Sequence, residues 1–437
     1  MSAAVLGLSI ASADEPIGAA KSRTEVQSTQ LISRSLDGGT PNGPSTNAVI
    51  SQDRRWSRYI AFESEATNLV RGDTNGVKDV FVVRRAGQFR NNGSRWMRGP
   101  TTLLSRGPQG PANGPSWGAA VDGSFWSVPS CVAFLSAASN LVAGDTNGKV
   151  DAFVSQRVGR LPKRVSLPGA TEDTTDVAVS GDCSRIAFVT GGKLYVKTSK
   201  KVRQIRAGVP ISDPSFSNGF SNDVVFTAPA GVYMSRGGTK RPKLIGPGGR
   251  NPAYSDIHKP PPNCKRRTFA YERKYKGRWQ IVVRVQGQKT RVISRRRTSH
   301  ANGDSRKPVI GNAGCYVTFE SDASNLGLNA TGRKGDHNSA PDVYLYTAVR
   351  RITLVQSVRN KAIPTQAGAR NPGMSWYANY IVFDSKAPLQ NQFRLEPWQF
   401  KSLEKSTSSA QYEDPVPPEQ RPPPENRQIY MRYLGPV

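Results

Sequence analysis

The chain has 437 residues, among them 41 glycines and 32 prolines, and its Lys and Arg outnumber Asp and Glu to give a net charge of +29. Abundant Gly and Pro favour many short strands joined by turns. No run of 18 apolar residues occurs, which excludes a transmembrane segment in the mature chain. A large positive charge attracts polyanions. We expect a monomer.

The first 26 residues have the pattern of a signal peptide followed by a linker. Residues 1–13 are apolar and end in the small residues Ala11, Ser12 and Ala13, as expected for a hydrophobic segment with a cleavage site. A signal peptide usually begins with basic residues, but no Lys or Arg precedes Lys21. Either the true start of translation lies upstream, or the stretch is a disordered end and not a signal peptide. We expect a secreted, extracellular or cell-envelope protein, exported by a bacterium.

An internal repeat dominates the rest of the chain. Residues 60–82 and 132–154 match almost residue for residue, 72 positions apart, and residues 317–346 are a looser third copy with a longer middle. Repeats of this length indicate a structural unit that is stacked several times.

Each unit is predicted to contain four short strands, met in the following order along the chain. Innermost segments include 47–51, 176–181, 307–312 and 371–376. A second strand, apolar and ending in an aromatic residue, occurs seven times, at 59–62, 131–134, 185–188, 224–226, 268–271, 316–319 and 380–383. A third, alternating strand also occurs seven times, at 79–84, 151–156, 193–198, 231–236, 279–285, 342–347 and 428–434. A fourth occurs six times, at 101–105, 163–167, 202–206, 242–246, 290–294 and 351–355.

The missing fourth strand of the last unit is predicted at the other end of the chain. Residues 29–33 (TQLIS) have the character of a fourth strand and precede the first innermost strand. Pairing them with the last unit would close a ring and cover an exposed sheet edge. The sequence therefore predicts a single domain at 27–437, an all-β, seven-bladed propeller of four-stranded antiparallel blades whose N-terminal strand closes the last blade.

Residues 180–188 (SGDCSRIAF) resemble the TolB-like, or WD40-like, propeller repeat, which reads Ser-x-Asp-Gly, two residues, then Ile-Ala-Phe. The resemblance extends over residues 27–437. It implies a propeller that binds partners or accompanies an enzyme, and it makes six blades the alternative to seven. Cys183 departs from the usual Gly, and no Gly-His or Trp-Asp signal recurs.

Two copies of the repeat contain a GDTNG turn with oxygen-bearing side chains at alternating positions. Such oxygens suit Ca²⁺, and the alternative is a plain turn capped by Asp. The candidate ligands are Asp73, Asn75, Asp79, Asp145, Asn147 and Asp151. In the third copy, Asp342 is equivalent to Asp79, with Asp336 and Asn338 as weaker candidates. Ca²⁺ is the one cofactor that the sequence suggests.

The four cysteines all lie just before or at the start of a second strand. An even number suits disulfides in an oxidising compartment, and neighbouring blades would supply the pairs. They are Cys131 with Cys183 and Cys264 with Cys315. Buried free thiols are the alternative, because equivalent strands of adjacent blades can lie too far apart for a bond.

The positive charge is concentrated in residues 259–307, which hold 16 Lys or Arg against Glu272 and Asp304. This segment predicts a polyanion-binding surface, with a solvated blade edge as the alternative. The candidates are Arg266, Arg267, Arg273, Lys274, Arg278, Arg295, Arg296 and Arg297. No recognised nucleic-acid module is present, so specific nucleic-acid binding is not expected.

No catalytic residue is predicted. Gly-Pro-Ser-Trp-Gly at 114–118 matches a nucleophile elbow only formally, since no helix follows, and the three histidines lack the spacing of a zinc site. A Pro-rich insertion at 389–427 is interpreted as a rim loop or a docking arm. We expect an exported, non-catalytic propeller that binds a protein or an acidic envelope polymer. The alternatives are a hydrolase or lyase with its site at the channel mouth and a calcium-dependent adhesion module.

Overall fold

The structure of the chain is a computed structural model. It describes residues 28–53, 56–86, 96–124, 127–219, 221–256, 264, 267–296, 298–311, 314–326, 340–348, 353–355, 358–359, 363–364, 368–386 and 427–434. The signal-peptide-like segment and all of the Pro-rich insertion but residue 427 lie outside these ranges.

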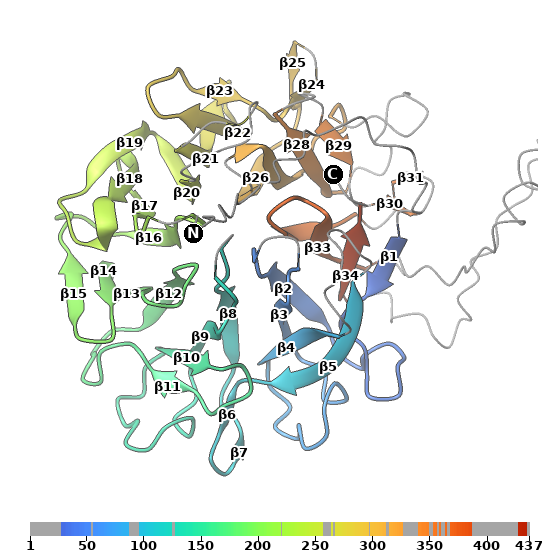
Figure 1. The fold of residues 1–437 in the computed structure, drawn as a ribbon, viewed down its shortest axis with the longest axis vertical. Coiled ribbons are helices and arrows are strands. Elements are labelled where there is room, and N and C mark those ends of the chain that lie inside the picture. Colours follow the sequence, from blue (N-terminus) through green and yellow to red (C-terminus); the bar gives the residue numbers. More distant parts are fainter. Residues whose placement is uncertain are drawn as a thin grey trace, which may run out of the picture.

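Seven four-stranded antiparallel sheets form a ring (Figure 1). From the innermost to the outermost strand, blade 1 is β2 (Ser45–Ile50), β3 (Tyr59–Ser64), β4 (Asp79–Ala86) and β5 (Met97–Leu103), and blade 2 is β8 (Ser116–Val121), β9 (Cys131–Ser136), β10 (Asp151–Gln156) and β11 (Lys163–Arg164). Blade 3 is β12 (Thr174–Val179), β13 (Ile186–Thr190), β14 (Lys193–Lys197) and β15 (Val202–Ile205), and blade 4 is β16 (Ser212–Phe216), β17 (Val224–Ala228), β18 (Gly231–Ser235) and β19 (Lys243–Pro247). Blade 5 is β20 (Gly249–Ser255), β21 (Thr268–Tyr275), β22 (Arg278–Val285) and β23 (Arg291–Val292), and blade 6 is β26 (Ser305–Gly311), β27 (Tyr316–Ser321), β28 (Asp342–Thr347) and β29 (Thr353–Val355).

Blade 7 joins the two ends of the described chain. It consists of β32 (Arg370–Met374), β33 (Tyr380–Ser385) and β34 (Gln428–Tyr433), with β1 (Ser28–Leu31) as its outermost strand. β1 and β34 are antiparallel and lie side by side in Figure 1. The predicted closure and the count of seven blades are therefore confirmed, and the alternative of six is wrong.

The smaller elements lie between blades or at their edges. Three two-stranded pairs are β6 (Arg106–Gly107) with β7 (Gly110–Pro111), β24 (Arg295–Arg296) with β25 (Ser299–His300), and β30 (Val358–Arg359) with β31 (Ile363–Pro364). Within the described ranges the only helical element is the single 3-10 turn η1 (Arg236–Gly238). No helix in this part of the chain has the length and apolar character needed to cross a membrane.

The aromatic residue that ends each predicted second strand has a structural role. In six blades it faces an aromatic residue of the third strand, as Phe62 does with Phe81, whose ring centroids are 5.9 Å apart. Such cross-strand aromatic pairs stabilise a sheet by about 0.5–1.5 kcal/mol each beyond the area they bury. In blade 5, Tyr271 instead faces Val282. The core thus runs between the blades as a ring of buried aromatic and β-branched side chains.

A β-bulge interrupts every innermost strand and helps to fasten the blades together. A bulge leaves a backbone N–H without a partner in its own sheet. In six blades an N–H at the bulge donates to a side-chain oxygen of the preceding blade. These contacts run from Asn47 to Asp384 (3.2 Å), Gly118 to Glu63 (2.9 Å), Asp213 to Asp176 (3.3 Å), Asn251 to Thr227 (2.9 Å), Lys307 to Glu272 (2.8 Å) and Asn371 to Glu320 (2.8 Å).

Candidate functional site

The centre of the ring is bridged by side-chain amides at one end. Gln52, in the turn after β2, donates to the carbonyl oxygens of Ile310 and Met374, both at 3.1 Å. Asn218, in blade 4, donates to the side chain of Gln52 at 2.8 Å. A cavity of about 310 Å³ lies against the innermost strands of blades 4 to 6 and is bordered by these two amides. The channel is therefore spanned by hydrogen bonds between blades far apart in sequence.

Two glutamates of the second strands, Glu272 and Glu63, accept hydrogen bonds that hold innermost strands in place. Glu272 accepts hydrogen bonds from Lys307 N, Asn251 Nδ2 and Arg250 Nε at 2.8–2.9 Å. Glu63 is similarly bound, and burial raises its pKa. Neither glutamate is a site residue predicted from the sequence, although an aromatic residue followed by Glu or Asp recurs at 62–63, 271–272, 319–320 and 383–384. A general acid or base needs free access to a substrate, so their bonding favours a structural role.

The two GDTNG turns lie in equivalent loops, each joining the second strand of a blade to the third. In blade 1, Asn75 Nδ2 donates to Asp79 Oδ2 at 2.7 Å and to the carbonyl of Ala112 at 2.9 Å. Ser105 donates to the other oxygen of Asp79. Burial raises the pKa of Asp79 to about 6, and the neighbouring charge of Asp73 adds to that rise. The structure thus brings all three candidates of this copy together.

The blade 2 loop has the same arrangement with one addition. Asn147 donates to Asp151 at 3.2 Å, and Ser166 donates to its other oxygen. Here Arg164 Nη1 also contacts Asp145 Oδ1 at 2.9 Å and Asp151 Oδ2 at 3.2 Å. In the third copy only Asp342 is described; Asp336 and Asn338 lie outside the described residues.

The basic residues predicted to bind polyanions do not form a single surface. Arg267 lies at the start of the blade 5 hairpin and pairs with Asp256 at 3.5 Å and Gln286 at 3.0 Å. Lys274 and Arg278 lie at the opposite end of that hairpin, about 20 Å away at the rise of an extended strand. Arg273 lies beside Lys274, and Arg295 and Arg296 form β24. Arg266 and Arg297 lie outside the described residues.

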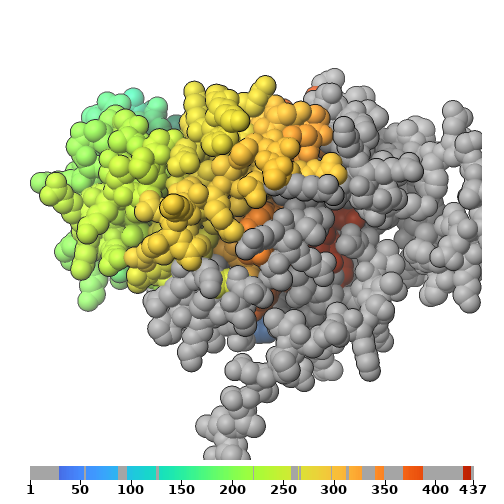
Figure 2. Space-filling model, turned by 90° about the horizontal axis from the view of Figure 1, so that it is seen from above, coloured from blue at the N-terminus to red at the C-terminus, as the bar shows by residue number. Residues whose placement is uncertain are grey.

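At the tip of the hairpin, cations and aromatic rings alternate. Arg250 lies 3.7 Å from the centroid of a Trp279 ring, and the Lys274 ammonium lies 5.4 Å from it. His300 packs on Tyr275, and its pKa is lowered by partial burial and then by the charges of Arg295 and Lys276. Figure 2 shows blade 5 in yellow as part of the rim, between blades 4 and 6. The tip is basic, but Trp279 already engages two of its cations.

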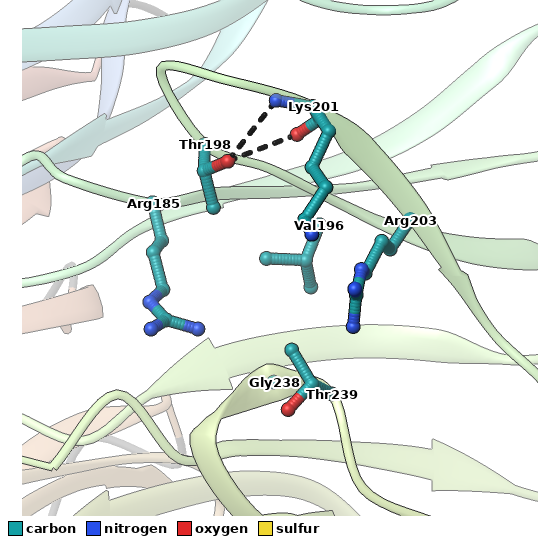
Figure 3. A pocket seen from close by; sticks show the side chains of 7 residues that line it. All are labelled: Arg185, Val196, Thr198, Lys201, Arg203, Gly238 and Thr239. Atoms are coloured by element: carbon teal, nitrogen blue, oxygen red, sulfur yellow. Dashed lines mark hydrogen bonds between the residues drawn. The ribbon is translucent and has the colours of Figure 1, made fainter.

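A second basic site, not predicted from the sequence, lies between blades 3 and 4. Arg185, Lys201 and Arg203 surround a pocket of about 210 Å³ (Figure 3). Buried Val196 forms an apolar part of its wall, and Gly238 and Thr239 close it from blade 4. No described carboxylate lies within 4.0 Å of the three cations. The available signal was the run KTSKKVRQIR at 197–206, which contains no acidic residue.

The turn between β14 and β15 and the start of β13 place these cations. Thr198 Oγ1 donates to the carbonyl of Lys201 at 3.1 Å and accepts from its backbone N–H at 3.2 Å, which fixes the turn. Arg185 donates from Nη1 to the carbonyl of Gly237 in blade 4. The remaining guanidinium donors of Arg185, with Lys201 and Arg203, can hydrogen-bond an anion.

Both cysteine pairs are bonded in the structure. Cys131 joins Cys183 with a Cα–Cα distance of 6.2 Å, and Cys264 joins Cys315 at 5.1 Å. Each bond links neighbouring blades, 2 to 3 and 5 to 6. Both Cα–Cα distances are below the roughly 7 Å that a disulfide can span.

Asp122 lies beside the first disulfide and accepts from the backbone N–H groups of Ser130 and Cys131 at 2.8–3.0 Å. Its oxygen and the two sulfurs lie within 4.8 Å of one another. The sulfurs are bonded to each other and offer no thiolate, which a metal ligand requires. Burial raises the pKa of Asp122 to about 7 despite these hydrogen bonds.

No protein-family model and no curated protein sequence matches the chain. Solved structures with a similar shape include a TolB protein described as putative from Agrobacterium tumefaciens, at 13% identity over 51% of this chain and 73% of that one, with a TM-score of 0.35. A prolyl endopeptidase aligns at 10% identity over 80% of this chain, with a TM-score of 0.43, and this chain spans about half (47%) of its length. U3-55K aligns at 8% identity over 93% of this chain and 98% of that chain, with a TM-score of 0.46. The likenesses add no assignment of function, and the propeller fold follows from the strand pairing itself.

Proposed function

We propose that the chain is an exported, non-catalytic propeller that binds an acidic polymer of the cell envelope, and that the pocket between blades 3 and 4 holds one of the polymer's anionic groups. The observation that carries this proposal is the grouping of Arg185, Lys201 and Arg203 around one pocket without a carboxylate partner among the described residues. A volume of about 210 Å³ is below the ~300–1,000 Å³ of pockets that enclose a whole small molecule. It suits a single phosphate or carboxylate group.

The long-range field of the chain supports the same function. A net charge of +29 draws a polyanion to the surface before any specific contact forms. At the pocket, charge-assisted hydrogen bonds are stronger than neutral ones, and Arg can hold phosphate or carboxylate with two parallel bonds. Attraction of this kind weakens as salt screens the charges.

The test measures binding of the full chain to immobilised poly(glycerol phosphate) teichoic acid and to polygalacturonate, at rising salt. Lys201→Gln with Arg203→Gln removes two pocket cations, and Lys163→Gln with Lys193→Gln removes two exposed cations elsewhere, so both variants carry the same net charge. We expect the pocket variant to lose about tenfold or more in affinity for at least one polymer, as removal of charge-assisted bonds predicts. The control should change it by less than about twofold.

The proposal is wrong if the wild-type chain binds neither polymer, or if both variants lose affinity equally. The polymer whose binding depends on the pocket cations identifies the anionic group as phosphate or carboxylate.

Export is the second part of the proposal. It rests on the apolar stretch at residues 1–13 and on two disulfides, which persist in oxidising compartments. Residues 1–26 fused to a reporter that is active only outside the bacterial cytoplasm should give activity. The same fusion with Leu6→Arg and Leu8→Arg, which interrupt the apolar stretch, should not.

A further inference from the structure

One position at the start of the third strand carries a buried polar side chain in several blades, and its hydrogen-bond partners differ from blade to blade. In blades 5 and 7 this position is Gln280 or Gln428, and each accepts a hydrogen bond from a serine hydroxyl through its side-chain oxygen. The amide nitrogen then donates to a backbone carbonyl, Gly303 at 3.1 Å or Gly43 at 3.0 Å. A neutral side chain therefore satisfies the site by itself in these two blades.

In blades 1 and 2 the same position is an aspartate, and a second aspartate lies six residues before it. The equivalent serine hydroxyl still donates, from Ser105 to Asp79 and from Ser166 to Asp151. In blade 2 the added negative charge is met by Arg164, which contacts both Asp145 and Asp151. A buried carboxylate pair is costly unless a cation accompanies it, and blade 2 contains that cation.

Blade 1 has the carboxylates without the arginine. Arg164 pairs in register with Phe153, and the residue in register with the equivalent Phe81 is Leu103. Leu103 is buried in the core and has no charge to offer. Asp73 is only 6% exposed, and its Oδ1 is buried with no hydrogen-bond partner among the described residues. Asp145 Oδ2 in blade 2 is likewise without such a partner, so the two loops differ in the guanidinium of Arg164, which contacts Asp145 Oδ1 and Asp151 Oδ2. An orphaned carboxylate oxygen beside a second carboxylate is the donor set of a hard cation.

We propose that the blade 1 loop binds one Ca²⁺ ion, held by Asp73 and Asp79, at the place that the Arg164 guanidinium fills in blade 2. Backbone carbonyls of the loop and water complete the flexible oxygen shell that Ca²⁺ accepts. Mg²⁺ fits less well, because it demands a near-ideal octahedron and keeps several of its waters. The two carboxylates of blade 1 carry a charge of −2, which one divalent ion balances. In blade 2 the Arg164 guanidinium occupies the equivalent place, so no ion is expected there.

The experiment titrates Ca²⁺ into the chelator-treated full chain by calorimetry and records the melting temperature with and without Ca²⁺. Asp73→Asn should remove one bound ion and abolish the Ca²⁺-dependent rise in Tm. Asp145→Asn is the matched control in blade 2, and it should leave the number of bound ions unchanged because Arg164 remains there.

Two further variants exchange the fourth-strand residue beside each loop between blades 1 and 2. Leu103→Arg copies blade 2 into blade 1 and should remove the ion while the far-UV spectrum stays that of the wild type. Arg164→Leu copies blade 1 into blade 2 and should add one bound ion.

A wild-type chain that binds no Ca²⁺ overturns the proposal. So does a stoichiometry that Asp73→Asn leaves unchanged, which would assign any bound ion to another part of the chain. Mg²⁺ at the same concentrations should bind at least about tenfold more weakly, and equal binding would overturn the assignment to Ca²⁺.

Discussion

The hydroxyl of Ser33 donates a hydrogen bond of 2.8 Å to the side-chain carbonyl of Gln428, 395 positions away in the sequence. The same hydroxyl accepts the backbone N–H of Ile429 at 3.0 Å. Equivalent serines make this pair of bonds in blades 1 and 5, through Ser105 and Ser294. The contact that completes the ring is thus the ordinary contact between third and fourth strands of a blade, made between the two ends of the chain.

Ser33→Ala should destabilise the ring at its closure. The substitution leaves the Ile429 N–H and the Gln428 carbonyl buried without that partner, and an unsatisfied buried polar group costs about 1–3 kcal/mol. Urea denaturation should show a free energy of unfolding lower by about that amount. Ser199→Ala, at an exposed turn position, should leave it within about 0.5 kcal/mol. Equal effects of the two variants would contradict a role for Ser33 in closure.

The acidic contacts between blades should depend more on hydrogen bonding than on charge. Glu272→Ala leaves donors from Lys307, Asn251 and Arg250 without their acceptor, and we expect a loss of about 1–3 kcal/mol, as for leaving buried donors unsatisfied. Glu272→Gln keeps one acceptor oxygen and should cost clearly less. Chemical denaturation of the two variants decides this, and a glutamine variant as unstable as the alanine one would show that the charge matters more.

Asp122 should make part of the stability depend on pH. Burial raises its pKa in the folded chain to about 7 from an ordinary value of 3.8. The folded state therefore holds a proton that the unfolded state has released, so stability is greatest below about pH 4, falls up to about pH 7 and is level above it. Three pH units correspond to about 4 kcal/mol. Asp122→Asn should remove this part of the curve of unfolding free energy against pH.

Asp182, in the turn of the next blade, provides the control for this prediction. Burial raises its pKa, but hydrogen bonds from Ser180 and Ser184 lower it by more, and the net shift is downward. Its contribution to stability is therefore present above the unfolded pKa and is lost as the pH falls. Asp182→Asn should change the curve in the opposite sense to Asp122→Asn, and a change of the same sign would contradict the assignment.

The disulfide between Cys131 and Cys183 should stabilise the chain mainly by restricting its unfolded state. It closes a loop with a sequence separation of 52, for which the loss of chain entropy corresponds to about 4 kcal/mol. The double variant Cys131→Ala, Cys183→Ala should unfold at lower urea concentration than the wild type. A reducing agent should lower the wild-type midpoint as well, and should affect the double variant only through Cys264 and Cys315.

The fold was predictable because each strand carries its own signal. The aromatic residue at the end of each second strand, such as Phe62 or Phe383, marked the blades, and residues 29–33 could be matched to the missing fourth strand by character alone. The basic pocket was not predictable, since Arg185 precedes the second strand of blade 3, Arg203 lies in its fourth strand, and residues of blade 4 complete the pocket wall. The difference between the two GDTNG loops was also hidden, because it depends on which residue of the fourth strand, Leu103 or Arg164, pairs with the equivalent phenylalanine of the third strand.

Seven blades joined through β1 and β34 also have an order of assembly. β1 is among the first strands to be synthesised, and its partner follows almost 400 positions later. Until then β1 has no sheet to join, and contacts so distant in sequence form slowly because bringing them together costs chain entropy. We therefore expect the nascent chain to build an open arc of blades first, so that its last strand decides when the molecule becomes a ring.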